Sequence, residues 1–162
     1  MKKEDLPNKL AVFPLSNFII FPKTTVPLNI FEPRYIQMID EAMKGDRIIG
    51  IVQPKKTGDL KKPNLYNVGC AGKITSFNET EDGRYLIILN GICRFKIMSE
   101  EENDKLYRIC KVNFSEYLED LNKKNEDINF NDLKFIFSEL KNFFKKQGYI
   151  VNLEDLKKNN LD

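Results

Sequence analysis

The chain has 162 residues, close to one average domain, and its 41% apolar composition allows a core and excludes a disordered protein. Its 26 lysines and arginines nearly balance its 24 aspartates and glutamates, and the formal charge of +2 argues against a nucleic-acid partner. The chain has no histidine, which removes the usual general base of hydrolases and the commonest metal ligand.

Prolines interrupt the first apolar pieces of the chain, which lie at 10–15, 18–21 and 24–28. Because proline lacks a backbone N–H donor, we expect these pieces to form short, edge-like or bent strands. None approaches the roughly 20 apolar residues of a membrane-spanning helix, and no apolar signal-peptide core follows the charged start of the chain. We therefore expect a cytoplasmic protein that makes no membrane contact.

A helix is predicted over 33–44. Pro33 suits the first turn of a helix, the following residues repeat an apolar face at helical spacing, and Gly45 is a typical C-terminal signal. The apolar run 48–52 that comes next is typical of a buried strand. We expect the lysine-rich segment 55–64 to be an exposed loop.

The strongest signal in the sequence is a β-hairpin. Two segments, 72–80 and 84–97, flank the turn 81–83, whose Asp-Gly pair supports positive φ. In the second arm, alternate apolar residues share one face of a sheet. Gly91 interrupts that pattern where a bulge or the sharp bend of a closing barrel would lie. With a further strand at 106–117, the sequence predicts a strongly bent antiparallel β-barrel.

The character of the chain changes after this last strand. A polar linker is expected at 121–127, and apolar residues at helical spacing between Leu133 and Phe144 predict a helix. Its apolar stripe is too small to close a bundle alone, so either it docks onto the sheet or the natural protein continues. We therefore predict two domains, a barrel at 1–118 and a C-terminal helical segment at 119–162.

Signatures of catalysis are missing from the sequence. It has no phosphate-binding P-loop, no dinucleotide-binding glycine turn and no nucleophile elbow. Cys70, Cys93 and Cys110 form no C-x-x-C pair, and each lies in an apolar strand-like run. We expect reduced, buried thiols, no zinc site and a reducing compartment. The sequence therefore predicts no catalytic residues, no metal and no cofactor.

The expected strands, helix and hairpin carry four sequence blocks: Leu10–Leu15, Phe31–Tyr35, Val68–Gly72 and Asn90–Phe95. Their order and spacing resemble the substrate-recognition domain at the start of the ATP-dependent Lon protease (protease La). The Phe31–Tyr35 block is most similar to the stand-alone bacterial members, which lack the rest of the protease. The resemblance implies a PUA-like β-barrel followed by a helical portion, a mainly β fold with some α (α+β).

The resemblance also implies a function. It indicates a non-catalytic module that binds unfolded or partner polypeptides, because the ATPase and Ser-Lys peptidase domains of the protease are absent from the sequence. RNA binding is an alternative, since PUA-like folds include RNA-binding members, but the small net charge argues against it. A peptidase is a second alternative, which the missing catalytic motifs disfavour.

The candidate binding residues are aromatics in proline-broken segments and charged or aromatic residues in the family blocks. They are Phe18, Phe21, Phe31, Glu32, Arg34, Tyr35 and Arg94. The aromatics either form an exposed binding patch or seal one end of the barrel. The charged residues either contact a ligand or form a structural ion pair that pins the predicted helix to the barrel.

Overall fold

The computed structural model describes residues 2–55, 62–122 and 130–146. The chain divides into two compact units, Met1–Asn122 and Lys123–Asp162. The domain boundary predicted between 118 and 119 stays a prediction. In chain order the elements are η1 (Lys3–Asp5), β1 (Lys9–Pro14), β2 (Thr25–Ile30), α1 (Pro33–Lys44), β3 (Ile48–Pro54), β4 (Leu65–Glu79), β5 (Tyr85–Glu101), β6 (Arg108–Asn113), η2 (Ser115–Leu121) and α2 (Phe130–Lys146).

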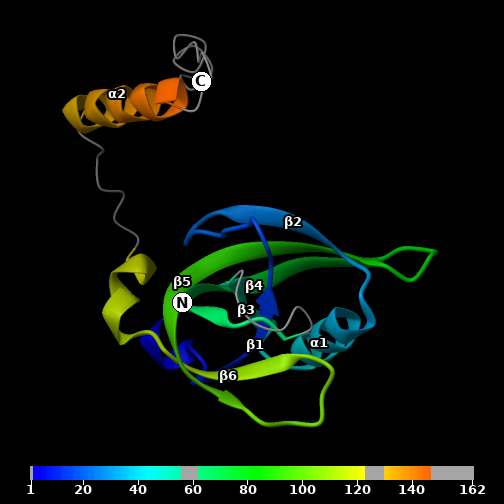
Figure 1. The fold of residues 1–162 in the computed structure, drawn as a ribbon. Coiled ribbons are helices and arrows are strands. Elements are labelled where there is room, and N and C mark those ends of the chain that lie inside the picture. The colour runs from blue at the N-terminus through cyan, green and yellow to red at the C-terminus, as the bar shows by residue number, and fades with distance from the viewer. Residues whose placement is uncertain (1, 56–61, 123–129, 147–162) are drawn as a thin grey trace. The chain divides into compact units, whose positions relative to one another are not determined.

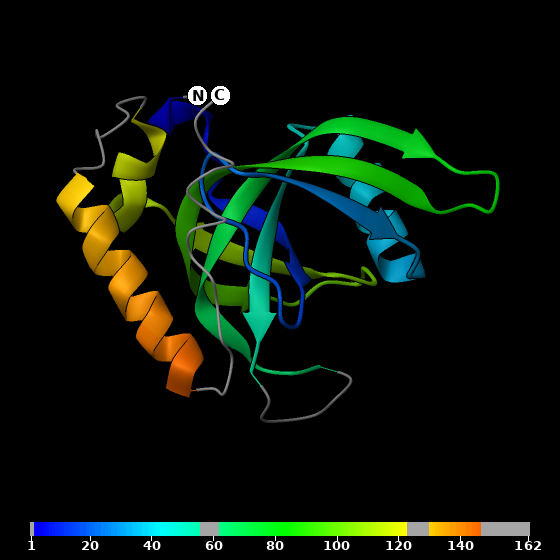
Figure 2. The ribbon, with the colours of Figure 1, turned by 90° about the horizontal axis from the view of Figure 1, so that it is seen from above.

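The first unit is a six-stranded sheet that closes on itself (Figures 1 and 2). Its order is β2-β5-β4-β3-β1-β6, and β6 also pairs with β5. The long strand β5 makes this closure possible, because Tyr85–Asn90 pairs with β2 and Lys96–Glu101 pairs with β6. The predicted mainly β fold with some α is confirmed.

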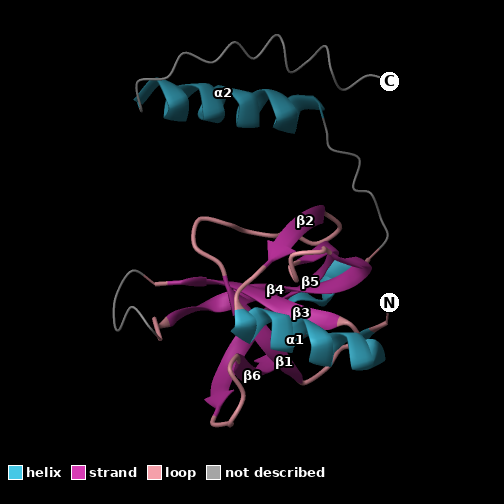
Figure 3. Ribbon diagram, turned by 90° about the vertical axis from the view of Figure 1, so that its right-hand side faces the viewer, coloured by secondary structure: helices cyan, strands magenta, loops and turns pink. Residues whose placement is uncertain are grey.

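One predicted detail of the sheet is wrong. The sheet is mixed rather than wholly antiparallel, because β1 and β3 run parallel, with Val12 opposite Gly50. The segment that carries β2 and α1 returns the chain to the same end of the sheet before β3 starts, as a parallel pair requires. Figure 3 shows α1 lying across this part of the sheet.

The proline-broken start of the chain also differs from the expectation. β1 is no edge strand, since it pairs with β3 on one side and β6 on the other, and Pro14 ends it. The segment 18–21 forms no strand and belongs to the connection between β1 and β2. β2 does lie at the end of the sheet order, where Pro27 breaks no ladder.

The local predictions of helices and of the hairpin are confirmed. The helix predicted over 33–44 is α1, the run 48–52 lies in β3, and the C-terminal helix is α2. The hairpin is β4–β5, with Gly83 in its turn at φ 78°. The predicted strand 106–117 is shorter, as β6, and the 3-10 helix η2 follows it. Parts of the predicted loop 55–64 and linker 121–127 lie outside the described residues.

Gly91 lies at a β-bulge, as its sequence position indicated. In the β4–β5 ladder Cys93 faces Ala71 and Gly91 faces Gly72, so Ile92 is the extra residue of β5. A Cβ at Gly91 would stand 2.0 Å from the carbonyl oxygen of Phe21. Only glycine therefore allows the Phe21 backbone to approach β5 this closely.

Two clusters of buried side chains fill the first unit. One surrounds Met38 and Ile39 of α1. The other surrounds Phe95, and apolar side chains of η2 pack against it. Cys70, Cys93 and Cys110 are buried free thiols, as predicted. Among the described residues, no helix has the length and apolar character needed to cross a bilayer.

Candidate functional site

A cavity of about 510 Å³ opens beside the connection between β1 and β2. It is lined by Phe18–Phe21, by Ile51–Gln53 and Lys55 at the end of β3, by Tyr66–Cys70 of β4, and by Arg94 of β5. Most of these residues are apolar, and the volume lies in the range of ordinary ligand pockets. The cavity is therefore the candidate functional site.

The bulge on β5 holds the segment Phe18–Phe21 in place. Lys23 N–H donates to the Gly91 carbonyl at 2.9 Å, and Gly91 N–H donates to the Thr24 carbonyl at 2.8 Å. The Thr24 hydroxyl donates to the Phe21 carbonyl at 2.7 Å and closes the turn. Lys23 adopts a left-handed φ of 65°, which is uncommon for a residue with a side chain. The backbone beneath the cavity's first wall is thus fixed by hydrogen bonds to the sheet.

Apolar side chains stand exposed on both walls of the cavity. On the first wall, Ile20 points into the core, whereas Ile19 and Phe21 are exposed. In the part of the lining that β4 supplies, Tyr66 and Val68 are exposed as well. Exposed apolar side chains that gather around one hollow are typical of a binding surface rather than of an ordinary solvated face.

Arg94 joins the cavity to η2. Its guanidinium donates two hydrogen bonds to the Asp120 carboxylate, from Nε at 2.9 Å and from an Nη atom at 2.8 Å. The Arg94 backbone N–H donates to the same carboxylate at 2.9 Å, and the guanidinium lies 4.8 Å from the Tyr117 ring centre. These hydrogen bonds from Arg94 hold the pKa of Asp120 below its usual value. Arg94 therefore pins η2, not α1, to the barrel.

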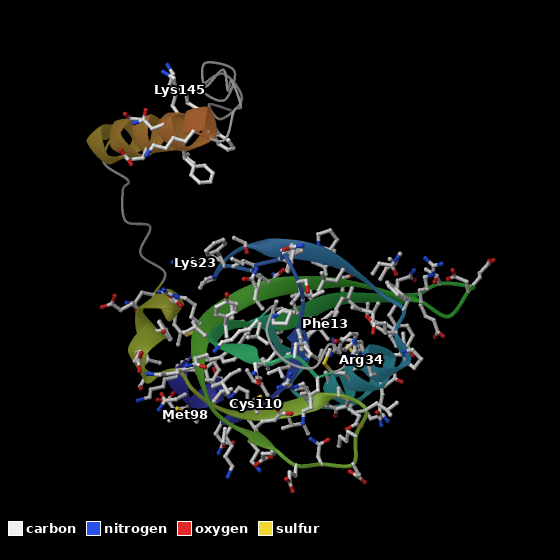
Figure 4. All side chains as sticks on the ribbon, viewed as in Figure 1. Phe13, Lys23, Arg34, Met98, Cys110 and Lys145 are labelled. Carbon is white, nitrogen blue, oxygen red and sulfur yellow. The ribbon has the colours of Figure 1, made fainter. Side chains whose placement is uncertain are left out.

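The other charged candidates lie on the α1 side of the molecule. Glu32 and Arg34 form a local ion pair at 2.7 Å at the start of α1. Tyr35 is buried, with its ring centre 4.1 Å from that of Phe13. In Figure 4, Arg34 lies far from Lys23, which ends the turn beside the cavity. Within residues 2–55, 62–122 and 130–146, neither charged residue therefore makes the predicted ion pair between the helix and the barrel.

The structure therefore divides the predicted site residues. Phe18, Phe21 and Arg94 line the cavity. Phe31 is exposed but does not line it, and Arg34 and Tyr35 line a smaller hollow of about 180 Å³ instead. Glu32 lines neither of these two hollows.

Sequence reasoning missed several residues of the cavity, namely Ile19, Lys55, Tyr66 and Val68. Because side chains alternate between the two faces of a strand, the sequence of β4 would have placed Tyr66 and Val68 on one face. Nothing local could have shown that this face lines the same cavity as Phe18–Phe21, because that depends on the order of the strands.

Burial keeps the three thiols protonated, and of the three Cys70 lines the cavity. Burial raises the pKa of the Cys70 thiol to about 12, so it stays protonated at neutral pH. Burial likewise raises the pKa of Cys93 and of Cys110 to about 11. Within the part of the chain that the structure describes, no three potential metal ligands of the His, Cys, Asp and Glu types gather at one place.

Comparisons with known proteins agree on one family. The family model of the ATP-dependent protease La (LON) substrate-binding domain matches residues 9–161. The Lon protease of Cytophaga hutchinsonii is 31% identical over 127 residues, which cover 76% of this chain and 16% of that protein. The Lon protease of Flavobacterium johnsoniae is 32% identical over 106 residues, covering 62% and 13%. The chain thus spans a small part of the curated relatives that it matches.

Two solved structures share the fold. A Lon N-terminal domain protein from Xanthomonas campestris superposes with a TM-score of 0.55 at 23% identity, covering 65% of this chain and 59% of that one. The N-terminal domain of the Mycobacterium avium complex Lon protease gives a TM-score of 0.53 at 13% identity, covering 86% and 69%. At these identities the likeness concerns the fold.

Proposed function

The chain belongs to the family of LON substrate-binding domains, and from this premise we propose that it is a non-catalytic module that holds polypeptides. It takes up exposed apolar segments of unfolded or partner proteins in the cavity beside Phe18–Phe21. The observation that carries this proposal is the pair of exposed apolar walls, with Ile19 and Phe21 on one side and Tyr66 and Val68 on the other.

The proposed mechanism is capture of apolar side chains in the cavity. Burying one large apolar side chain contributes about 1.5–3 kcal/mol, and the ordering of a flexible polypeptide offsets part of this gain. Gln53 and Asn67, also in the lining, offer polar groups to the backbone of the bound segment. Weak affinity and broad specificity follow, as suits a site that meets many unfolded sequences.

The proposal excludes peptide hydrolysis by this chain. No histidine is available as a base, and the Cys70 thiol at the cavity has a pKa of about 12. Incubation with unfolded casein, with or without ATP, should yield no fragments on a gel. Reproducible fragments that vanish when a serine is substituted would overturn this part of the proposal.

The chain's lack of tryptophan allows a clean test of binding. A permanently unfolded, tryptophan-containing test protein is titrated with the full chain, and the fluorescence of its tryptophan is followed. We expect a saturable change at micromolar to high micromolar concentrations. Phe21→Ala should weaken binding by about tenfold, the effect typical of a residue central to an interface.

Phe31→Ala is the matched control. Phe31 is the same residue type and is 65% exposed, compared with 60% for Phe21, but it does not line the cavity. Its removal should leave the affinity unchanged. Equal losses from both substitutions, or no saturable signal with the unaltered chain, would contradict the proposed function.

A further inference from the structure

The charged groups of the cavity have one sign. Among the described residues that line it, Lys55 and Arg94 carry positive charge and none carries a carboxylate. In the chain as a whole, acidic and basic residues nearly balance, with 24 of one and 26 of the other. The lining therefore differs in charge from the chain as a whole.

Lys55 stands at the edge of the apolar wall formed by β4. Its Nζ lies 5.8 Å from the ring centre of Tyr66, and the side chain is half-buried. The backbone N–H of Lys55 donates to the Asn64 carbonyl at 2.7 Å, which fixes where the side chain starts. A ligand side chain packed against Tyr66 would therefore have an ammonium group beside it.

Arg94 presents positive charge to the same cavity although it is paired. In its bond with Asp120 the guanidinium is 48% exposed, whereas the carboxylate is only 10% exposed. The negative partner is thus covered and lies outside the lining, while the positive partner reaches it. A ligand in the cavity would therefore contact the positively charged guanidinium rather than the Asp120 carboxylate.

From this asymmetry we infer the chemistry of the polypeptide that the cavity takes: an apolar anchor with aspartate or glutamate next to it. The inference rests on the proposed function. The anchor fills the space between Phe21 and Tyr66, and the neighbouring carboxylate pairs with the Lys55 ammonium and faces the Arg94 guanidinium. A lysine at the same place in the ligand would face like charges and bind less well.

The test uses two synthetic peptides with the same Leu-Trp-Leu core, one flanked by aspartates and the other by lysines, titrated with the full chain. At low salt the aspartate peptide should bind about two- to fivefold more tightly, the range expected for one ion pair at a surface. The preference should shrink in 1 M NaCl, where the screening length is about 3 Å. Lys55→Glu should reverse the preference, so that the lysine peptide binds more tightly than the aspartate peptide.

Lys73→Glu is the control for net charge. Lys73→Glu changes the total charge by the same amount as Lys55→Glu. Lys73 lies on β4, as Tyr66 does, but it is exposed and outside the lining. It should preserve the preference for the aspartate peptide. If it removes the preference as Lys55→Glu does, the effect belongs to the whole molecule and the inference is overturned.

The remaining outcomes separate this inference from the proposed function. Equal binding of both peptides, each weakened by Phe21→Ala, would overturn the inference and leave the proposed function standing. No binding of either peptide would overturn both. Sedimentation that shows dimers dissociated by Phe21→Ala would identify a second copy of the chain as the occupant, and would also overturn the inference.

Discussion

Phe21 and Phe31 make an instructive pair. Both lie next to β2, and they are exposed to nearly the same extent, 60% and 65%. Phe21 lines the same cavity as Tyr66 and Val68, whereas Phe31 precedes α1 and lines neither hollow. Exposure is common among apolar residues and by itself indicates little. An exposed aromatic becomes a binding candidate when the fold brings other apolar side chains to face it.

The same contrast holds for Arg94 and Arg34. Arg94 bonds to a carboxylate 26 positions away and connects two elements, while Arg34 bonds to one only two positions away at the start of its own helix. A long-range pair with one covered partner organises the tertiary structure around the cavity. A local, exposed pair adds little to the fold. Three substitutions, each compared with a second variant, test these two contrasts.

The largest effect is expected from Gly91→Ala. The new Cβ would stand 2.0 Å from the Phe21 carbonyl oxygen. That oxygen accepts hydrogen bonds from Thr24, and the Gly91 backbone is bonded to Lys23 and Thr24, so neither side can move without breaking these bonds. We expect urea denaturation to show a loss of about 1–3 kcal/mol in the free energy of unfolding. Peptide binding should fall by about tenfold or more, because Phe21 is displaced.

Gly83→Ala separates the effect on the cavity from the effect on stability. Gly83 lies in the hairpin turn at φ +78°, and no atom lies within 4 Å of the place that a Cβ would take. Its substitution strains the backbone by about 1 kcal/mol but touches no part of the cavity. Binding should be retained. Equal loss of binding in both variants would mean that the bulge does not position Phe21.

A smaller effect is expected from Asp120→Asn. The substitution keeps the shape of the side chain and removes the charge that Arg94 holds, so the free energy of unfolding should fall by about 1–2 kcal/mol at pH 7. Because the pKa of Asp120 is lowered in the folded state, the pair stabilises the fold above the unfolded pKa of about 3.9. That contribution is lost as the pH falls through the lower folded pKa.

The gap in stability between the unaltered chain and Asp120→Asn should therefore narrow in acid, as measured by urea denaturation at several pH values. Glu116→Gln is the control on the same element, η2, where an exposed carboxylate pairs with Lys96 at 2.9 Å. Because that pair is solvated, its loss should leave the free energy of unfolding nearly unchanged. A gap that is independent of pH would contradict the assigned ion pair.

Local signals explain how much of the fold could be predicted. Pro33 and Gly45 bound α1 because a helix needs particular residues at its ends, and Gly83 marks the hairpin because its φ is positive. Gly91 indicated the bulge for a different reason, since its lack of a side chain lets the Phe21 backbone approach β5. The segment 18–21 was wrongly predicted as a strand because it is an apolar run. Ile20 is buried in the core and Phe18 packs against it, whereas Ile19 and Phe21 are exposed in the cavity lining.

The candidate site was less predictable because it is built from distant segments. Phe18, Phe21 and Arg94 were identified from composition and from family blocks, but Tyr66 and Val68 join them in one lining only through the strand order. The parallel pairing of β1 with β3 helps to set that order, and an antiparallel sheet was expected. Sequence patterns indicate which face of a strand is apolar, and the topology decides what that face meets.

The smallest effect is expected from Arg34→Ala. Its ion pair with Glu32 joins two half-exposed side chains, and its guanidinium lies 4.5 Å from the Tyr35 ring centre. Each contact is worth at most about 1 kcal/mol at such a position, so the loss in unfolding free energy should stay at about 0.5–1 kcal/mol. Peptide binding should not change, because Arg34 lies outside the cavity.

Other bonds should hold α1 in place when Arg34 is removed. The Tyr85 hydroxyl donates to Asp40 at 2.9 Å, and the Tyr107 hydroxyl donates to Glu41 at 2.8 Å. Each of these two bonds connects the helix to another part of the fold. The ion pair of Arg34 with Glu32 does not. Tyr107→Phe should therefore destabilise the fold at least as much as Arg34→Ala does, in the same urea titration. Unfolding of the domain by Arg34→Ala alone would instead make Arg34 the pin of the helix, and the contrast with Arg94 would fail.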